Sequence, residues 1–480
     1  MSKNFLILIT CITIFFCQNK EIYPSLKYKI NEPQLKNLEI EIINKFLNNK
    51  DLPIPGYNFS ERIDFIGTVQ FNMTDSKFRF LDLTDKTFEI LFDSPDKISI
   101  KLYNVKAQIS FYYIFRSNFY SNKGTGKIAI KDTSLTMNSK VLRVKNKKDD
   151  SKYGPGIEIE SFSLEAKDFE FDFEHEGTLE KMIEYILLNG KNAIVQIIKN
   201  KFNSDYRPMI NKQLLTLSEN STLIFPIPRT KMSVHYSMNH EPKITENYLI
   251  MEFEAEVNHP EIKYPKDTIK LPDFYETKYA IELMISQYLF DNSLYIAGKD
   301  KLLDGILYNE QSKFTVDIIK DCFKNITQKY NKTDLVDLGL FVKEPPEIIF
   351  EEGSAYIIIN ENLTFYTRKT NTSERVIAIA GDSVFEFNVT FSIEKSKIAA
   401  KIENGKLKSF KTTYTTFDQD DESVVKDSSI LITGSISLLN IGIQTALANM
   451  RLPTIAGIEL HNFEVKFKEK YVYFGVLPII

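Results

Sequence analysis

A long alternation of apolar and polar residues limits the possible folds of this chain more than any other feature. From Ile63 to Glu174 the pattern repeats with a period of two between turn signals, as in the segment FEFDF at Phe169 to Phe173. A period of two places successive side chains on opposite faces of a β-strand. The segment therefore predicts a series of strands that each bury one face.

Helical periodicity appears on both sides of this strand region. A first helix is predicted at 33–48, where Leu35, Leu38, Ile42 and Phe46 recur at helical spacing. A second, longer helix is predicted from about Thr178 to Phe202, with Gly190 inside it as a point of kinking or breakage. Its apolar positions include Met182, Ile183, Ile186, Leu187, Ile194, Ile197, Ile198 and Phe202.

The second half of the chain repeats the same mixture of elements. A connector with four prolines, 232–273, contains one predicted strand at Tyr248–Val257. The later predictions are a helix near 312–330, strands at 348–407, a short helix near 438–450 and a strand pair at 458–467 and 471–476. Amphipathic helices beside antiparallel strands favour an α+β fold in which curved sheets wrap around helices.

The start of the chain has the pattern of a secretory signal. A short basic end precedes an apolar run, Phe5 to Phe16, and polar residues return at Gln18, which predicts a signal peptide at 1–17. About twelve apolar residues are too few to cross a hydrocarbon core of ~30 Å. The protein is therefore expected to be secreted, either to the extracellular space or to the lumen of the endomembrane system.

The cysteines and the N-glycosylation sequons were also compared with what is expected of an exported protein. Cys11 and Cys17 lie in the predicted signal, which leaves Cys322 as a buried thiol or, less favoured, an intermolecular bridge. Sequons for N-glycosylation are frequent, and those that are used should mark the surface. They begin at Asn58, Asn72, Asn220, Asn325, Asn331, Asn362, Asn371 and Asn388.

Charge is unevenly distributed between the two halves of a chain of 480 residues, a length typical of two or three domains. Residues 18–240 carry 32 basic against 28 acidic side chains, whereas 241–480 carry 27 against 36. The first half is thus the better partner for an anionic surface. The excess is too small for a nucleic-acid-binding protein.

Motifs for catalysis or metal binding are absent from the sequence. GTGK at Gly124–Lys127 lacks the upstream glycine and the Ser/Thr of a P-loop, and DQDDE at Asp418–Glu422 lacks the glycine and the terminal glutamate of an EF-hand loop. The five histidines have no metal-ligand spacing, and no Gly-x-Ser-x-Gly elbow occurs. No catalytic residue, metal or cofactor is predicted.

Four segments together resemble one known family. SQYLFDNSLYIAGKDKLL, Ser286 to Leu303, follows the proline-rich connector. It is similar to the segment that opens the C-terminal half of the bactericidal/permeability-increasing and lipopolysaccharide-binding protein family. The matching residues are Ser286, Tyr288, Phe290, Asn292, Ser293, Tyr295, Ala297 and Gly298. LPIPGYNF at 52–59, VHYSM at 234–238 and the final segment 451–476 resemble other parts of that family in the same order.

The resemblance implies a boomerang-shaped molecule of two barrels, each of strongly curved antiparallel sheet around a long helix, with a shared central sheet. The implied domains are 18–231, a linker with central strands at 232–253, and 254–480. Two departures stand out. The family's disulfide between the first barrel and its long helix has no cysteines here, near Ile157 or Arg207. The helix should then be held by packing alone, at a cost of a few kcal/mol. The last helix also looks shortened and is interrupted by Pro453.

The resemblance further implies a monomeric, secreted lipid-binding or lipid-transfer protein without catalytic activity. It would act peripherally at membranes, with phospholipid or lipopolysaccharide as partner and a role in innate defence. The predicted pocket wall is Leu35, Leu38, Ile42, Phe46, Met182, Ile186 and Ile197. The predicted headgroup-binding tip is Arg116, Lys123, Lys140, Arg143, Lys145, Lys147, Lys148 and Lys152. Two alternatives remain open, a secreted structural or adhesive glycoprotein without lipid and a lipid-acting enzyme.

Overall fold

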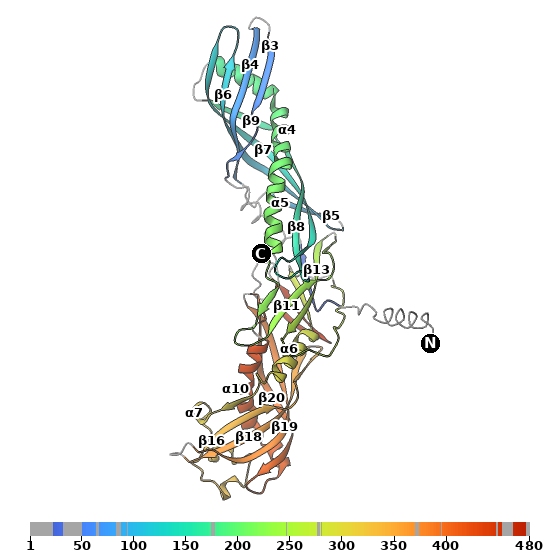
Figure 1. Ribbon diagram of the computed structural model, residues 1–480, viewed down its shortest axis with the longest axis vertical. Coiled ribbons are helices and arrows are strands. Elements are labelled where there is room, and N and C mark those ends of the chain that lie inside the picture. The colour runs from blue at the N-terminus through green and yellow to red at the C-terminus, as the bar shows by residue number, and fades with distance from the viewer. Residues whose placement is uncertain are drawn as a thin grey trace, which may run out of the picture.

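A computed structural model describes residues 23–31, 50–63, 67–82, 88–93, 95–173, 178–245, 247–275, 279, 281–369, 374–394, 396–447, 450–453 and 464–476. The predicted signal peptide, the helix predicted at 33–48 with its four pocket residues, and the sequon at Asn371 lie outside these residues. Within them the chain is an elongated α+β protein with three antiparallel sheets arranged along its long axis (Figure 1).

The N-terminal sheet has the order β2-β4-β6-β7-β8, with β3, β5 and β9 paired to its inner strands. Its members are β2 (Leu52–Pro53), β3 (Tyr57–Ile63), β4 (Gly67–Asp82), β5 (Phe88–Asp93), β6 (Lys97–Arg116), β7 (Ser121–Lys145), β8 (Tyr153–Glu165) and β9 (Asp168–Phe173). Buried and exposed residues alternate along β6 and β7, so the prediction from the period of two is confirmed.

The long helix that follows is longer than predicted. It comprises α3 (Thr178–Asn189), α4 (Lys191–Lys201), a π-helical turn at Phe202–Tyr206 and α5 (Arg207–Glu219). Gly190 separates α3 from α4, as the sequence indicated. Beyond Phe202 the apolar periodicity weakens because several side chains on this part of the helix are polar and bind the sheet instead of packing in the core.

Side-chain amides fasten this helix to β8, the edge strand of the N-terminal sheet. The Asn211 amide donates to the Ile159 carbonyl at 2.8 Å and accepts from the Ile159 backbone N–H at 2.8 Å. Asn203 makes the same pair of bonds with Phe162, both at 2.9 Å, and the Arg207 guanidinium donates to the Glu160 carbonyl. The prediction that packing alone holds the helix is therefore wrong.

The central sheet has the order β10-β11-β13-β1-β14-β22-β21, with β12 paired to β13. Its strands are β1 (Leu26–Asn31), β10 (Ile224–Pro226), β11 (Ser233–Met238), β12 (Lys243–Ile244), β13 (Tyr248–Asn258), β14 (Ile281–Ser286), β21 (Glu464–Lys468) and β22 (Tyr471–Val476). Because this sheet contains β1 as well as β21 and β22, segments from near both ends of the chain share it.

The C-terminal sheet has the order β15-β16-β18-β19-β20, with β17 paired to β18. The strands are β15 (Gly305–Leu307), β16 (Leu335–Val342), β17 (Glu347–Glu351), β18 (Ser354–Arg368), β19 (Val376–Glu394) and β20 (Lys397–Thr415). The helices are α6 (Gln287–Lys299), α7 (Asn309–Ser312), α8 (Val316–Ile319), η3 (Ile326–Gln328), α9 (Asp421–Lys426) and α10 (Ser429–Ala446).

Two helix predictions in this half are wrong. The segment 312–330 holds only the single turns α8 and η3, because the chain turns repeatedly between Ile319 and Lys329 to bury Phe323 and Ile326. The last helix is not shortened: α10 begins at Ser429, nine residues before the predicted start, and has 18 residues. Small and polar residues, including Gly434 and Ser435, lie on the buried face of α10. They interrupt the apolar pattern from which the start of a helix is predicted, so the predicted start falls too late in the sequence.

Candidate functional site

The inner face of the N-terminal sheet, the face toward the long helix, carries most of its aromatic side chains. Cross-strand partners share a face, and the register aligns Phe111 of β6 with Gly126 of β7 and then Phe173 of β9. The same register places Phe171 beyond Ile128 and Phe169 beyond Ile130. The three phenylalanines of β9 therefore extend the apolar inner face past the end of β8.

These three rings form a regular stack that the rest of the protein leaves partly uncovered. The ring centroids of Phe169 and Phe171 are 6.5 Å apart, as are those of Phe171 and Phe173, with planes inclined by 22° and 6°. Each of the three is only partly buried, in contrast to the fully buried Phe71 and Phe111 beside them. Incompletely covered aromatic rings on an inner face are what a lipid-binding wall requires.

Tyr57 and Phe59 of β3 and Met182 of α3 are likewise partly buried and pack against the same core. We refer to Tyr57, Phe59, Phe169, Phe171, Phe173 and Met182 as the N-terminal apolar wall. The sequence pattern identified β9 as a half-buried strand, but alternation alone does not tell whether the apolar face is covered.

The other predicted pocket residues of the long helix have different environments. Ile186 is 1% exposed and belongs to the packed core, whereas Ile197 of α4 is partly buried. Phe202 lies deeper, where its ring contacts Phe78 and Phe162 at centroid distances of 5.6 and 5.5 Å. At the level of the π-helical turn the inner space is thus occupied by the protein's own rings.

The far end of the N-terminal sheet presents two uncovered aromatic side chains. The turn Ser117–Tyr120 joins β6 to β7, and in it Phe119 is 84% and Tyr120 is 54% exposed. The Ser117 backbone N–H donates to the Tyr120 carbonyl at 2.7 Å, which closes the turn. Arg116 and Lys123, two of the predicted tip residues, are exposed beside it. We call these four residues, Arg116, Phe119, Tyr120 and Lys123, the N-terminal tip.

The remaining predicted tip residues lie at the opposite end of β7, which spans about 80 Å at ~3.3 Å per residue. There the loop 146–152 is bound to the end of α5: the Lys147 backbone N–H donates to the Glu219 carbonyl, and the Asn146 amide to the Ser221 carbonyl, both at 2.8 Å. The adjoining Tyr153 backbone N–H donates to the Ser237 hydroxyl of β11 in the central sheet at 3.1 Å. The expected placement of this loop at the tip is therefore wrong. Gly154, Pro155 and Gly156, which follow this loop, belong to the start of β8.

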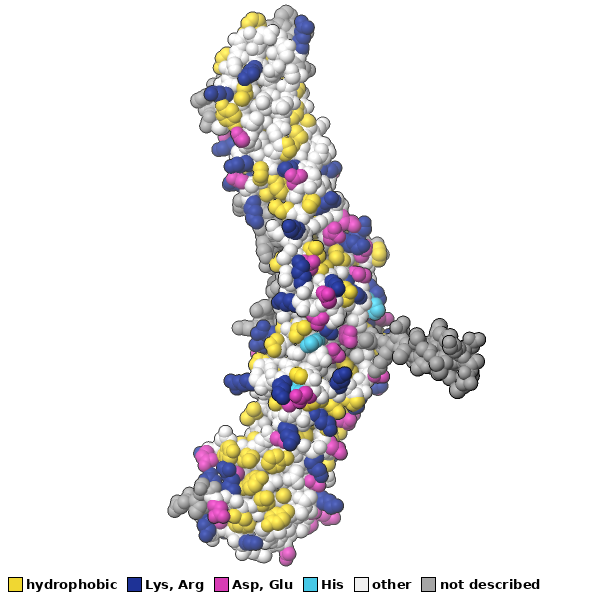
Figure 2. All heavy atoms as spheres, viewed as in Figure 1, with side chains coloured by type: hydrophobic (Ala, Val, Ile, Leu, Met, Phe, Trp, Pro, Cys, Tyr) yellow, Lys and Arg dark blue, Asp and Glu magenta, His cyan; other side chains and the backbone are white. Residues whose placement is uncertain are grey.

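Acidic partners accompany most of these basic side chains. Lys147 pairs with Glu219 at 2.5 Å, Lys140 with Asp96 at 3.0 Å and Lys145 with Asp150 at 3.5 Å. The Arg143 guanidinium donates to the Asn239 carbonyl at 2.5 Å, and Lys148 is exposed. Lysine and arginine side chains occur along the whole visible face of the molecule and do not gather at one end (Figure 2).

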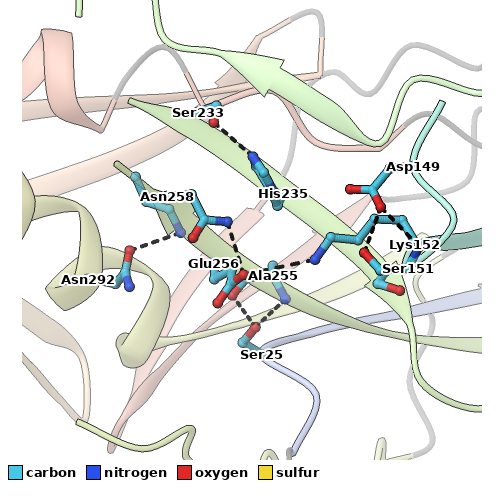
Figure 3. Close-up of polar contacts among 12 residues, drawn as sticks. Ser25, Asp149, Ser151, Lys152, Ser233, His235, Ala255, Glu256, Asn258 and Asn292 are labelled. Carbon is cyan, nitrogen blue, oxygen red and sulfur yellow. Dashed lines mark hydrogen bonds and ion pairs between the residues drawn. The ribbon is translucent and has the colours of Figure 1, made fainter. Parts of the chain in front are cut away.

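Lys152 reaches from this loop to the central sheet, where its ammonium lies 3.9 Å from the Glu256 carboxylate (Figure 3). Burial, and secondarily the charge of Lys152, lowers the pKa of the neighbouring His235, whose ring bonds the Ser233 hydroxyl at 2.9 Å. Burial beside Glu256 raises the pKa of Glu254. Lys152, His235, Glu254 and Glu256 thus form a polar cluster where the N-terminal sheet meets the central sheet.

Among the described residues, no group of three or more His, Cys, Asp and Glu side chains could hold a metal ion.

The asparagines of the predicted glycosylation sites differ in exposure. Asn58, Asn220, Asn331 and Asn388 are exposed, whereas Asn72, Asn325 and Asn362 are partly buried. The Asn362 amide also donates to the Asp382 carboxylate at 3.2 Å. The exposed four are the sterically favourable sites, and their use stays a prediction.

Comparison with known proteins identifies both a family and a fold. The sequence model of the "LBP / BPI / CETP family, C-terminal domain" matches residues 229–477, just over half of the chain. The crystal structure of lipopolysaccharide binding protein superimposes with a TM-score of 0.55 at 14% identity, over 95% of this chain and 100% of that one, a likeness of fold. No curated protein sequence matches.

Two further solved structures are more distant. P47 of Clostridium botulinum E1 gives a TM-score of 0.27 at 9% identity over 95% of this chain and 100% of that chain. Takeout 1 of Epiphyas postvittana gives 0.23 at 11% identity over 38% of this chain and 88% of that chain.

Proposed function

Because the chain belongs to the LBP / BPI / CETP family, we propose that it binds lipid and holds the acyl chains against the N-terminal apolar wall. The observation that carries this proposal is the stack of Phe169, Phe171 and Phe173, whose rings lie on the inner face and are only partly buried. The chain is expected to carry the lipid without altering it chemically.

The energetics of transfer explain why such a wall is useful. Each methylene group removed from water contributes ~0.8 kcal/mol, so a two-chain phospholipid leaves a bilayer very slowly without assistance. Apolar side chains that are already partly uncovered offer the acyl chains an environment close to that of the bilayer. Extraction, carriage and delivery of lipid are then the natural activities of this protein.

Contact with the lipid surface is assigned to the N-terminal tip. Aromatic rings beside cationic groups suit the interface between headgroups and acyl chains, as in Phe119 and Tyr120 next to Arg116 and Lys123. Anionic headgroups, among them the phosphates of lipopolysaccharide, fit the positive charge. We place this action outside the cell or in a secretory lumen, with the protein as a peripheral monomer.

The four exposed sequons are also consistent with an alternative function, that of a secreted adhesive glycoprotein that holds no lipid. Lipid extraction and native mass spectrometry of the protein from a secreting host separate the two functions. We expect copurified phospholipid in the wild type and a several-fold lower lipid content in Phe171→Asp, which places a charge within the apolar wall. Tyr414→Asp, at an aromatic residue that is 51% exposed in β20, serves as the matched control and should retain the lipid.

A wild-type protein that is empty as purified, and that takes up no labelled phospholipid from vesicles, would favour the adhesive glycoprotein.

A further inference from the structure

We infer that the chain carries one lipid molecule, bound in its N-terminal half, because the interior of its C-terminal half is filled by its own side chains. This inference rests on the proposed lipid binding and specifies where, and in what number, the lipid is held. A second lipid would need apolar space where the C-terminal sheet meets the central sheet.

Four phenylalanine rings occupy that junction. They come from four separate elements: Phe290 from α6, Phe350 from β17, Phe391 from β19 and Phe467 from β21. Ring centroids lie 4.7 Å apart for Phe290 and Phe391, 5.4 Å for Phe290 and Phe350, and 5.8 Å for Phe350 and Phe467. Such distances are those of rings in direct contact. Phe290, Phe350 and Phe391 are at most 6% exposed.

Five further rings of the C-terminal interior are packed in the same way. Phe323 contacts Phe365 at 4.9 Å and Phe410 at 6.2 Å, and Phe385 stacks on Phe387 at 5.2 Å. All five rings are at most 6% exposed, so their surfaces are already covered by protein. An acyl chain could enter only by displacing them.

Helix α10 closes the C-terminal sheet at short range. A Cβ atom added to Gly434 would lie 2.7 Å from Leu338 Cδ2, and one added to Gly442 would lie 2.7 Å from Leu303 Cδ2. The Asn440 amide also accepts from the Ile402 backbone N–H at 2.9 Å and donates to the Ile402 carbonyl at 3.3 Å, which ties α10 to the edge strand β20. No methyl-sized gap remains at the two glycines.

A buried carboxyl group makes this interior a poor environment for lipid as well. Glu361 of β18 is 0% exposed, and the Ser435 hydroxyl of α10 donates to its Oε1 at 3.5 Å. In the N-terminal half, by contrast, Phe169, Phe171 and Phe173 stay partly uncovered beside the buried rings of Phe71 and Phe111.

The experiment counts lipids per chain after blocking the N-terminal wall in the folded protein. Phe171→Cys is purified, stripped of lipid and alkylated with a bulky aromatic maleimide, then incubated with vesicles of palmitoyl-oleoyl-phosphatidylglycerol beside the wild type. Cys322 is 0% exposed and should not react. Alkylated Tyr414→Cys is the matched control, and thermal unfolding verifies that each variant is folded. Native mass spectrometry then gives the number of phospholipids per chain.

We expect one phospholipid in the wild type and in the Tyr414→Cys control, and none in the blocked Phe171→Cys protein. Two lipids in the wild type with one left after blocking would overturn the inference while leaving the proposed function intact. One lipid that survives blocking would also overturn it, because the lipid would then lie elsewhere. No lipid in any sample would refute the proposed function and this inference with it.

Discussion

Glu361 shows what a single buried ionisable residue does to this protein. Its Oε2 atom has no hydrogen-bond partner among the described residues, and burial raises the pKa of the carboxyl well above its ordinary value. The native state therefore retains a proton that the unfolded chain releases as pH rises. The resulting stability is fully present below the unfolded-state pKa and is lost as pH rises through the folded-state pKa.

Glu361→Gln should remove this pH dependence, since a neutral amide of similar size mimics the protonated acid. The melting temperature of the variant should equal that of the wild type near pH 4 and exceed it at pH 7.5, by roughly 2–4 °C for each kcal/mol gained. Thermal unfolding followed by circular dichroism across that pH range measures the difference. A constant difference at all pH values would show that Glu361 is not protonated preferentially in the folded protein.

The residues of the candidate site illustrate how far sequence reasoning reaches. Arg116 and Lys123 are predicted to belong to the tip because they accompany exposed-looking aromatic residues near the basic loop. The structure shows that both side chains are exposed beside the turn 117–120, and their role in headgroup binding stays a prediction. Phe171 was recognised as facing inward but not as part of a binding wall. Its partial exposure arises because β8 pairs with β7 only from Ser134 onward, whereas β9 pairs with the earlier part of β7, Gly126 to Lys131. The alternation of apolar and polar residues does not reveal which strands pair.

At the scale of elements, both halves use the same device to join a helix to a sheet edge. Asn211 binds both backbone groups of Ile159, next to a β-bulge at Glu160, and Asn440 does the same for Ile402, next to a bulge at Glu403. An edge strand has unpaired N–H and C=O groups that must be satisfied or covered. The sequence alone does not reveal this role, because an asparagine on a predicted helix is expected to face solvent.

Asn211→Ala should therefore loosen the helix at β8 without affecting the core. Loss of two hydrogen bonds to a covered strand should lower the free energy of unfolding by about 1–3 kcal/mol. It should also speed hydrogen exchange at the Ile159 amide. Asn200→Ala is the control, because Asn200 is exposed on α4, where its side chain accepts a hydrogen bond from the Gln196 amide at 2.8 Å. Equal exchange at Ile159 in both variants would mean that the Asn211 bonds contribute nothing measurable.

The boundaries of the helices were the least predictable part of the fold. Apolar spacing located the start of the long helix, but not its continuation from Phe202 to Glu219, where Asn203, Arg207 and Asn211 bind the sheet. The start of α10 was missed for a related reason. Glycine and serine are poor helix formers in isolation, yet at Gly434 and Ser435 they permit the close approach that the packing requires.

At the scale of the whole molecule, the length of β7 keeps two groups of basic residues far apart in space, although they are close in sequence. Lys123 lies at one end of this strand and Lys145 at the other, so a tip made of both cannot exist. The period of two predicted the strand, but not that it would run without a turn through 25 residues. The sequence analysis therefore predicted one tip of eight basic residues, whereas six of the eight lie toward or beyond the other end of β7.

This separation gives a prediction for binding to anionic vesicles. Phe119→Ala with Tyr120→Ala should weaken binding at low salt several-fold, because both rings are exposed beside Arg116 and Lys123 at the tip. Arg116→Gln with Lys123→Gln should weaken it further and reduce its salt dependence, since each basic residue near an anionic surface contributes ~1 kcal/mol. Vesicle cosedimentation at two ionic strengths measures both effects.

The matched control is Lys145→Gln with Lys147→Gln and Lys148→Gln, which removes more positive charge but far from the tip. Lys145 and Lys147 are paired with Asp150 and Glu219, and the loop is bound to the end of α5. If binding required only net positive charge, this triple variant would lose the most affinity. We expect it to bind nearly as well as the wild type, because a membrane that touches the tip lies tens of ångströms from this loop, well beyond a Debye length of ~8 Å. Stronger loss in the triple variant than in the tip variants would move the membrane-binding surface to the middle of the molecule.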